Sequence, residues 1–228
     1  MIEISAGYGV LCATAKQCGL LGSIAVDKVR KSGAYSSIVQ LDLRNLEHNN
    51  LVAEWMQSPL FCWLHVAPVC GTASRAREIQ RHWSDPKPLR SNDFPRGLPD
   101  LSEKDMTRVD IANDLFAYSC KRFQDAAACN IFVTMENPSN SYFWLTDWFT
   151  RLRQSVALTI TDFQACMYGG KRPNGRDLLG TLTNSLRSTP GVTIRINMIL
   201  GDLPKLMTAP VFGQQVWSQS IQNSCALP

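Results

Sequence analysis

Short apolar runs alternate with amphipathic stretches along most of this chain. The chain opens on an apolar run, turns through Gly7 and Gly9, and continues into an amphipathic stretch over residues 10–21. A second apolar run follows and closes at Asp27. This order predicts a strand, a glycine turn, a helix and a second strand that ends in an acid.

The same alternation continues further along the chain. Apolar runs predict four more strands, at residues 37–42, 60–67, 130–136 and 156–163. Amphipathic periodicity predicts helices at residues 46–56, 105–125 and 142–152. A long irregular segment lies between them at residues 71–108, and β-like stretches follow at 179–182 and 192–199. Loops as long as 71–108 are usually functional or disordered.

Alternating strands and helices predict the α/β class, with a doubly wound, mostly parallel sheet and helices on both faces. We expect an α/β domain over residues 1–165 and a basic C-terminal extension over residues 166–228. Ligands of such sheets bind at the carboxyl ends of the strands. The sequence places these residues there: Gly7, Gly9, Asp27, Asp42, Cys70 and Glu136.

Composition adds little to this picture. The 228 residues are 45% apolar and 18% charged, which is enough apolar material for a core and argues against disorder. The net charge of +4 is compatible with a nucleic-acid partner but does not require one. We expect a soluble, intracellular protein of the nucleus or cytoplasm, because no signal peptide and no apolar run long enough to span a membrane is visible.

The eight cysteines are scattered and form no Cys-x-x-Cys pair, and only three histidines accompany them. We therefore expect reduced thiols and no metal site. Cys70 differs from the others because it follows a predicted strand end and precedes Gly71. Nearby Arg75 and Arg77 favour a nucleophilic thiolate. The alternative is a buried structural cysteine in a loop.

Glu136 closes another predicted strand and is followed by Asn137. A carboxylate there can present a proton or a hydrogen bond to a bound ring, whereas the alternative is a turn in which Asn137 or Ser139 caps the next helix. Basic residues gather in two further places. One is the loop after Cys70, and the other is residues 151–205, where eight basic and three acidic residues give +5. Both suit phosphate contacts, and both also suit a solvated surface.

Taken in order, these pieces resemble the cytosine-5 DNA methyltransferases, over about residues 2–176. The resemblance implies S-adenosylmethionine as cofactor and DNA as substrate. It implies cofactor contacts at Ala6, Gly7, Tyr8, Gly9, Asp27, Asp42 and Pro68. It implies catalytic roles for Cys70, Glu136 and a basic residue after the sixth strand, with Arg172 and Arg176 as candidates. It implies nucleic-acid contacts at Arg75, Arg77 and Arg81.

In the mechanism that this resemblance implies, the target base leaves the duplex and the Cys70 thiolate attacks its C6 atom. Glu136 hydrogen-bonds to N3 of the base. The chain departs from the family at Val69, where proline is usual, and at Gly71, where glutamine is usual. Only about 50 residues follow residue 176, too few for a target-recognition domain. A catalytically inactive binding or structural subunit, with a protein partner, and a methyltransferase acting on RNA therefore remain alternatives.

Overall fold

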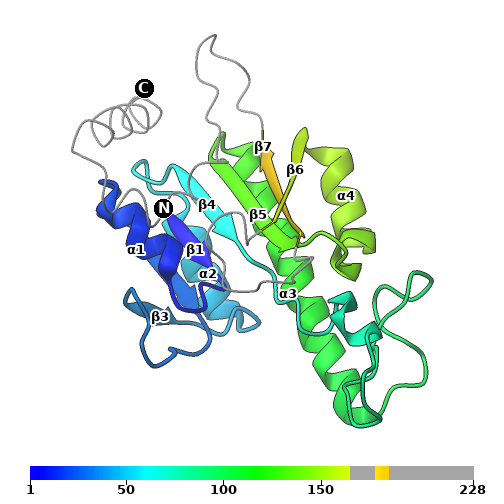
Figure 1. The fold of residues 1–228 in the computed structure, drawn as a ribbon. Helices are drawn as coiled ribbons and strands as arrows, with labels where there is room; N and C mark the ends of the chain where they lie inside the picture. Colours follow the sequence, from blue (N-terminus) through cyan, green and yellow to red (C-terminus); the bar gives the residue numbers. More distant parts are fainter. Residues whose placement is uncertain (165–177, 185–228) are drawn as a thin grey trace.

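The structure is a computed structural model that describes residues 1–164 and 178–184 (Figure 1). Its strands are β1 (Ile2–Ile4), β2 (Ile24–Asp27), β3 (Ile38–Gln40), β4 (Trp63–Val66), β5 (Phe132–Pro138), β6 (Leu158–Gln164) and β7 (Leu178–Asn184). Its helices are α1 (Val10–Gln17), α2 (Leu46–Trp55), α3 (Glu103–Ala128) and α4 (Asp147–Ser155), with short 3₁₀ helices η1 (Arg75–Glu78) and η2 (Tyr142–Leu145).

Seven strands form one sheet in the order β3-β2-β1-β4-β5-β7-β6. The first five pair in parallel, so their carboxyl ends share one edge. β7 lies antiparallel to both β5 and β6. The chain moves outward from β1 to β3 and then returns to the other side of β1 with β4. This reversal between β1 and β4 is a topological switch point, the place where ligands of open α/β sheets bind.

The two faces of the sheet are covered by different helices. Side chains of α2, α3 and α4 pack with one set of strand residues, which includes Ile2, Ile4 and Val133. Side chains of α1 pack with the opposite set, which includes Ala25 and Trp63. Successive residues of a strand point to opposite faces, so this division follows directly from the strand pattern.

These findings confirm the expected α/β sheet of mostly parallel strands. The sheet continues beyond residue 165, the expected end of the α/β domain, because β7 pairs within it.

The helix predicted at residues 142–152 is wrong in one respect, since η2 and α4 are separated at Thr146. That residue is extended, and its buried hydroxyl donates to the carbonyl of Phe143 at 2.7 Å, which ends η2. The predicted strand at 192–199 lies outside the described residues.

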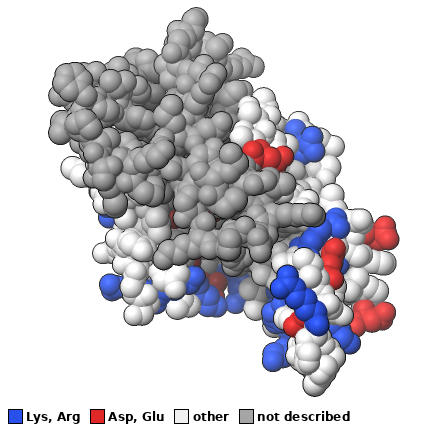
Figure 2. All heavy atoms as spheres, viewed as in Figure 1, with Lys and Arg blue, Asp and Glu red and all other residues white. Residues whose placement is uncertain are grey.

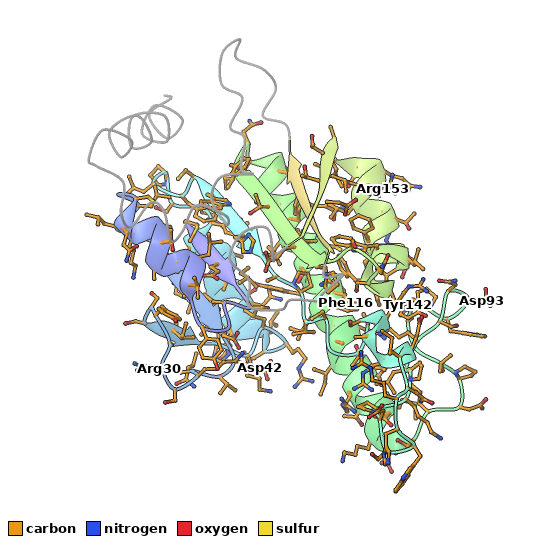
Figure 3. All side chains as sticks on the ribbon, viewed as in Figure 1. Arg30, Asp42, Asp93, Phe116, Tyr142 and Arg153 are labelled. Atoms are coloured by element: carbon orange, nitrogen blue, oxygen red, sulfur yellow. The ribbon has the colours of Figure 1, made fainter. Side chains whose placement is uncertain are left out.

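The long α3 starts below the carboxyl edge of the sheet in the view of Figure 1, and the segment between η1 and α3 lies along its first turns. Ser102 caps this helix by accepting a hydrogen bond from the backbone N–H of Asp105 at 3.2 Å. The helix therefore begins at Glu103, two residues before the predicted start. Phe143 of η2 packs edge to face against Phe116 of α3, with ring centroids 4.9 Å apart. Figure 3 shows Asp93 at the outer end of the segment that precedes α3.

Candidate functional site

The turn after β1 has an unusual backbone. Ser5, Gly7 and Gly9 all have positive φ angles, of 59°, 58° and 66°. A Cβ atom on Gly9 would lie 3.0 Å from Cδ1 of Ile38, whereas one on Gly7 would meet only the Lys31 Nζ, at 3.8 Å. Gly9 thus serves close packing, whereas among the described residues only the end of the Lys31 side chain approaches Gly7. Gly9, the N-cap residue of α1, has no side chain to cap the helix, and Glu3 satisfies only the N–H of Cys12 in its first turn, so the N–H groups of Val10 and Leu11 face the place where an anionic ligand would bind.

Asp27 lies directly against this turn. Its Oδ2 accepts a hydrogen bond from the backbone N–H of Gly7 at 2.9 Å, and its Oδ1 accepts one from Val29 N–H at 3.3 Å. The glycine turn and the acid of β2, which the sequence predicted to meet, are therefore in contact. A carboxylate has about four lone-pair positions, so Asp27 can still accept hydrogen bonds from hydroxyl groups of a ligand.

Asp42 lies one strand further out, below β1–β3 in the view of Figure 3. Its carboxylate pairs with Lys28 Nζ at 2.8 Å and with Arg44 Nη2 at 3.5 Å. The hydrogen bond from Lys28 is the main reason that the pKa of Asp42 falls to about 2. Asp42 therefore stays ionised, and a ligand that contacts it must share it with these two cations.

The cysteine turn follows β4. Cys70 is exposed, and its carbonyl accepts hydrogen bonds from the backbone N–H groups of Ala73 at 3.0 Å and Ser74 at 2.8 Å. These bonds close a tight turn immediately after the thiol. Of the two possibilities raised by the sequence, the structure rejects a buried structural cysteine.

The end of β5 lies against this turn. Met135 of β5 pairs with Val66, the last residue of β4, so Glu136 and Asn137 continue past the end of β4. The Asn137 side chain, only 2% exposed, donates from Nδ2 to the carbonyl of Pro68 at 2.8 Å. This bond brings the Glu136 strand end beside the turn that carries Cys70.

A buried carboxyl, that of Glu3 in β1, connects the two halves of the edge. Its Oε2 accepts a hydrogen bond from the backbone N–H of Cys12 at 2.8 Å. Burial, followed by the charges of Glu136 and Asp27, raises its pKa to about 7, although the Cys12 bond acts in the opposite direction. Glu3 is therefore close enough to both Asp27 and Glu136 to respond to their charges.

His65 is a further buried polar residue on the same face. It lies between Glu3 and Thr134 in the strand register. Its Nδ1 is 2.8 Å from the Thr134 hydroxyl, which also accepts a hydrogen bond from Trp63 Nε1 at 3.0 Å. Burial lowers the pKa of His65, and the charge of Glu136 opposes this shift. The imidazole is therefore neutral at neutral pH.

Sequence reasoning missed Glu3 and His65 as members of the site. The available signal was an ionisable residue inside an apolar run: Glu3 lies between Ile2 and Ile4, and His65 lies between Leu64 and Val66. Such residues are rarely buried without a partner, so an ionisable residue in an apolar run indicates a buried polar contact.

A buried arginine fixes the long segment to the cysteine turn. Arg90 is only 1% exposed. Its Nη2 donates to the Thr72 hydroxyl at 3.0 Å, and its Nη1 donates to the Pro95 carbonyl at 2.7 Å and to Asn113 Oδ1 at 2.8 Å. Its guanidinium also lies over the Phe116 ring. Arg90 belongs to the basic loop after Cys70, for which the sequence suggests phosphate contacts, but its guanidinium is an internal brace.

Two of the three predicted nucleic-acid contacts also hold protein groups. Arg75 donates from Nε to the Asn140 carbonyl at 3.0 Å, and its guanidinium lies over the Tyr142 ring. Arg77 donates to the carbonyls of Gly71 at 2.8 Å and Lys87 at 2.9 Å. Arg81, in contrast, has an exposed side chain. Figure 2 shows Lys and Arg side chains along the lower edge of the molecule in that view.

Arg172 and Arg176 lie outside the described residues. Within residues 1–164 and 178–184, no group of three or more His, Cys, Asp and Glu side chains is arranged to hold a metal ion. No helix in this part of the chain has the length and apolar character needed to cross a membrane.

No family model matches the chain, and neither the curated proteins nor the solved structures that were compared with it include a match.

Proposed function

We propose that the chain is an S-adenosylmethionine-dependent methyltransferase of the cytosine-5 type that acts on DNA. One observation carries this proposal: the exposed Cys70 turn is hydrogen-bonded to the Glu136 strand end, on the same sheet edge as the Gly7–Asp27 contact. A nucleophile, a carboxyl group and a glycine turn with an acid are the parts that the family resemblance requires, and Cys70, Glu136 and the Gly7–Asp27 pair would supply them along the carboxyl edge of the sheet.

The sheet supports the same reading. Its order follows the 3-2-1-4-5-6 order of dinucleotide-binding sheets, with β7 inserted antiparallel between β5 and β6. A Rossmann-like, mostly parallel sheet is the fold that the resemblance to methyltransferases implies.

The residues around the glycine turn fit the cofactor. Gly7 offers an open approach, the N–H groups at the start of α1 suit an anionic carboxylate, and Asp27 has lone pairs left for ribose hydroxyls. Asp42 would contact the adenine side, and Ala6, Tyr8, Gly9 and Pro68 would complete the contacts. When bound, S-adenosylmethionine would supply an electrophilic methyl group.

The remaining residues act on the base. The Cys70 thiolate would add to C6 of a cytosine, which moves electron density toward C5 and N3. Glu136 would donate a hydrogen bond to N3 and stabilise that charge. After C5 has gained the methyl group, loss of the C5 proton and breakage of the bond between C6 and the Cys70 sulfur would restore the aromatic ring and release the thiolate.

A catalytically inactive binding subunit is the second candidate. It is favoured by Val69 and Gly71, which flank Cys70 where the family has proline and glutamine. Such a protein would bind cofactor or nucleic acid without forming a covalent bond to a base.

A covalent trapping experiment separates these candidates. The full chain is incubated with S-adenosylmethionine and a DNA duplex that contains 5-fluorocytosine, and adducts are detected by mass and by denaturing electrophoresis. We expect an adduct with the wild type and with Cys129→Ala, which removes another exposed cysteine, but none with Cys70→Ala. Cofactor binding without any adduct would favour the inactive subunit, and an adduct that persists in Cys70→Ala would contradict the proposed nucleophile.

A further inference from the structure

The segment from Glu78 to Pro88 forms an excursion that we call the arm. Arg77, the residue just before the arm, donates from Nη1 to the carbonyl of Lys87 near the end of the arm, so it holds the two ends together. It also donates from Nε to the carbonyl of Gly71. Gly71 directly follows Cys70. The arm therefore leaves and rejoins the body beside the cysteine turn, and its base is fixed by one side chain.

The turn within the arm is also held in place. The Asp85 carboxylate accepts hydrogen bonds from the backbone N–H groups of Arg81 at 2.7 Å and His82 at 2.8 Å. The imidazole Nδ1 of His82 is 2.7 Å from the Ser84 hydroxyl. The backbone around Trp83 is thus ordered before any partner binds, which lowers the entropic cost of binding.

This ordered turn presents large apolar side chains to solvent. Trp83 is 87% exposed and Ile79 is 62% exposed. The ring of His82 lies beside the indole, with ring centroids 5.4 Å apart. The solvent-facing indole contributes nothing to the packing of the described core and is accessible to a partner.

The charges of the arm indicate what that partner is. Its two acids are already engaged: Asp85 holds the turn, while Glu78 accepts from the Tyr142 hydroxyl and pairs with Arg75 at 3.6 Å. Within the described residues, the exposed side chains of Arg81 and Lys87 make no ion pair. The arm therefore presents an aromatic pair and two unneutralised cations.

We propose that the arm is a nucleic-acid contact in which Trp83, supported by His82, stacks on an unpaired nucleobase while Arg81 and Lys87 neutralise neighbouring phosphates. Aromatic side chains combined with cations are the usual elements of single-strand binding. A base that has left the duplex, as the proposed reaction requires, exposes stacking faces on its neighbours. The inference extends the proposed function by assigning the substrate contact to the arm instead of to Arg75 and Arg77.

Fluorescence anisotropy with a labelled 20-nucleotide DNA strand, the same sequence as RNA, and the matching DNA duplex tests this contact without cofactor. One stacked base contributes about 1–3 kcal/mol, so Trp83→Ala should weaken binding of the single strands about 5- to 150-fold. Trp83→Phe should retain most of the affinity because it keeps a stacking ring. The two single strands distinguish a DNA from an RNA substrate, and binding to either supports the stacking contact.

Leu60→Ala is the matched control, because Leu60 is 85% exposed but lies outside the arm. Its affinity should equal that of the wild type. Wild-type affinity in Trp83→Ala, or an equal loss in Leu60→Ala, would overturn the inference. A wild-type chain that binds none of the three nucleic acids would also overturn it and leave a protein as the partner of the arm.

The proposed function can fail separately. A chain that binds no S-adenosylmethionine, yet shows Trp83-dependent affinity for nucleic acid, would overturn the methyltransferase proposal and support the stacking contact. A chain that forms the Cys70 adduct but binds nucleic acid independently of Trp83 would support the methyltransferase proposal and overturn the stacking contact.

Discussion

The β1–β3 half and the β4–β5 half of the carboxyl edge are held in different ways. In the first half, Asp27 contacts Gly7 and Asp42 contacts Lys28, all within the first 42 residues. In the second half, Asn137 reaches across 69 residues to Pro68, and Arg90 joins the cysteine turn to α3. The half expected to bind cofactor is a local unit, whereas the half expected to react is assembled from distant segments.

This difference has a physical consequence. A local unit forms at little cost in loop-closure entropy, whereas the reactive half depends on a few long-range contacts made by buried polar groups. Loss of one such contact leaves a buried partner unsatisfied, which costs more than loss of an exposed bond. Substitutions in the reactive half should therefore have the larger effects.

The largest effect is expected for Arg90→Met. This change removes a buried guanidinium and leaves Thr72 and Asn113 without their donors, so we expect a loss of about 3–5 kcal/mol in the free energy of unfolding. Urea unfolding measures it, and proteolysis of the segment before α3 should become faster. Arg108→Met is the control, because solvent screens its exposed ion pair with Asp105 and the change should therefore affect stability little. Equal effects of the two changes would contradict the bracing role.

Glu3→Gln tests the group that connects the two halves. The folded-state pKa of Glu3 is raised from 4.5 to about 7, so the folded protein binds more protons than the unfolded chain between these values. Wild-type stability should therefore fall as pH rises through this window, by up to about 3 kcal/mol. Glu3→Gln should remove this contribution, so that it gains stability over the wild type at pH 8 but not at pH 4.

Urea unfolding at both pH values measures this difference. An identical pH dependence in the two proteins would show that Glu3 is not buried near the charges of Asp27 and Glu136, and the two halves would then not meet at Glu3.

Asn137→Ala removes the bond that joins β5 to the cysteine turn. We expect a loss of about 1–3 kcal/mol in the free energy of unfolding, because the Pro68 carbonyl loses a buried donor. The rate at which iodoacetamide modifies Cys70, followed by peptide mass spectrometry, should also change. Asn140→Ala is the control, since Asn140 is exposed and contributes only its backbone carbonyl. If iodoacetamide modifies Cys70 at the wild-type rate in both variants, the hydrogen bond between Asn137 and Pro68 does not position the thiol.

The smallest effect is expected in the local half, for Gly9→Ala. A side chain at φ +66° is strained, and its Cβ would press on Ile38, so we expect a loss of about 1–2 kcal/mol. Gly22→Ala, where a Cβ meets nothing within 4 Å, should change stability by less. Thermal unfolding compares them, and equal stability of the two variants would contradict the turn geometry.

The contrast between the halves also explains what the sequence could predict. Gly7, Asp27 and Asp42 were predictable because each is a local signal at the end of an apolar run. Arg90 was not, because it is one of several cations in an irregular segment and only tertiary packing distinguishes it. The same holds for the division between η2 and α4, where the aromatic-rich pattern continues through Thr146 although the backbone does not.

Calorimetric titration of the full chain with S-adenosylmethionine tests the central claim most directly. The account predicts saturable binding of one molecule per chain. It also predicts that affinity falls at least about tenfold in Asp27→Ala, because a carboxylate that accepts hydrogen bonds from ribose hydroxyls contributes more than about 1.4 kcal/mol. A folded wild-type chain that takes up no cofactor, or an Asp27→Ala variant that binds it as tightly as the wild type, would contradict the account.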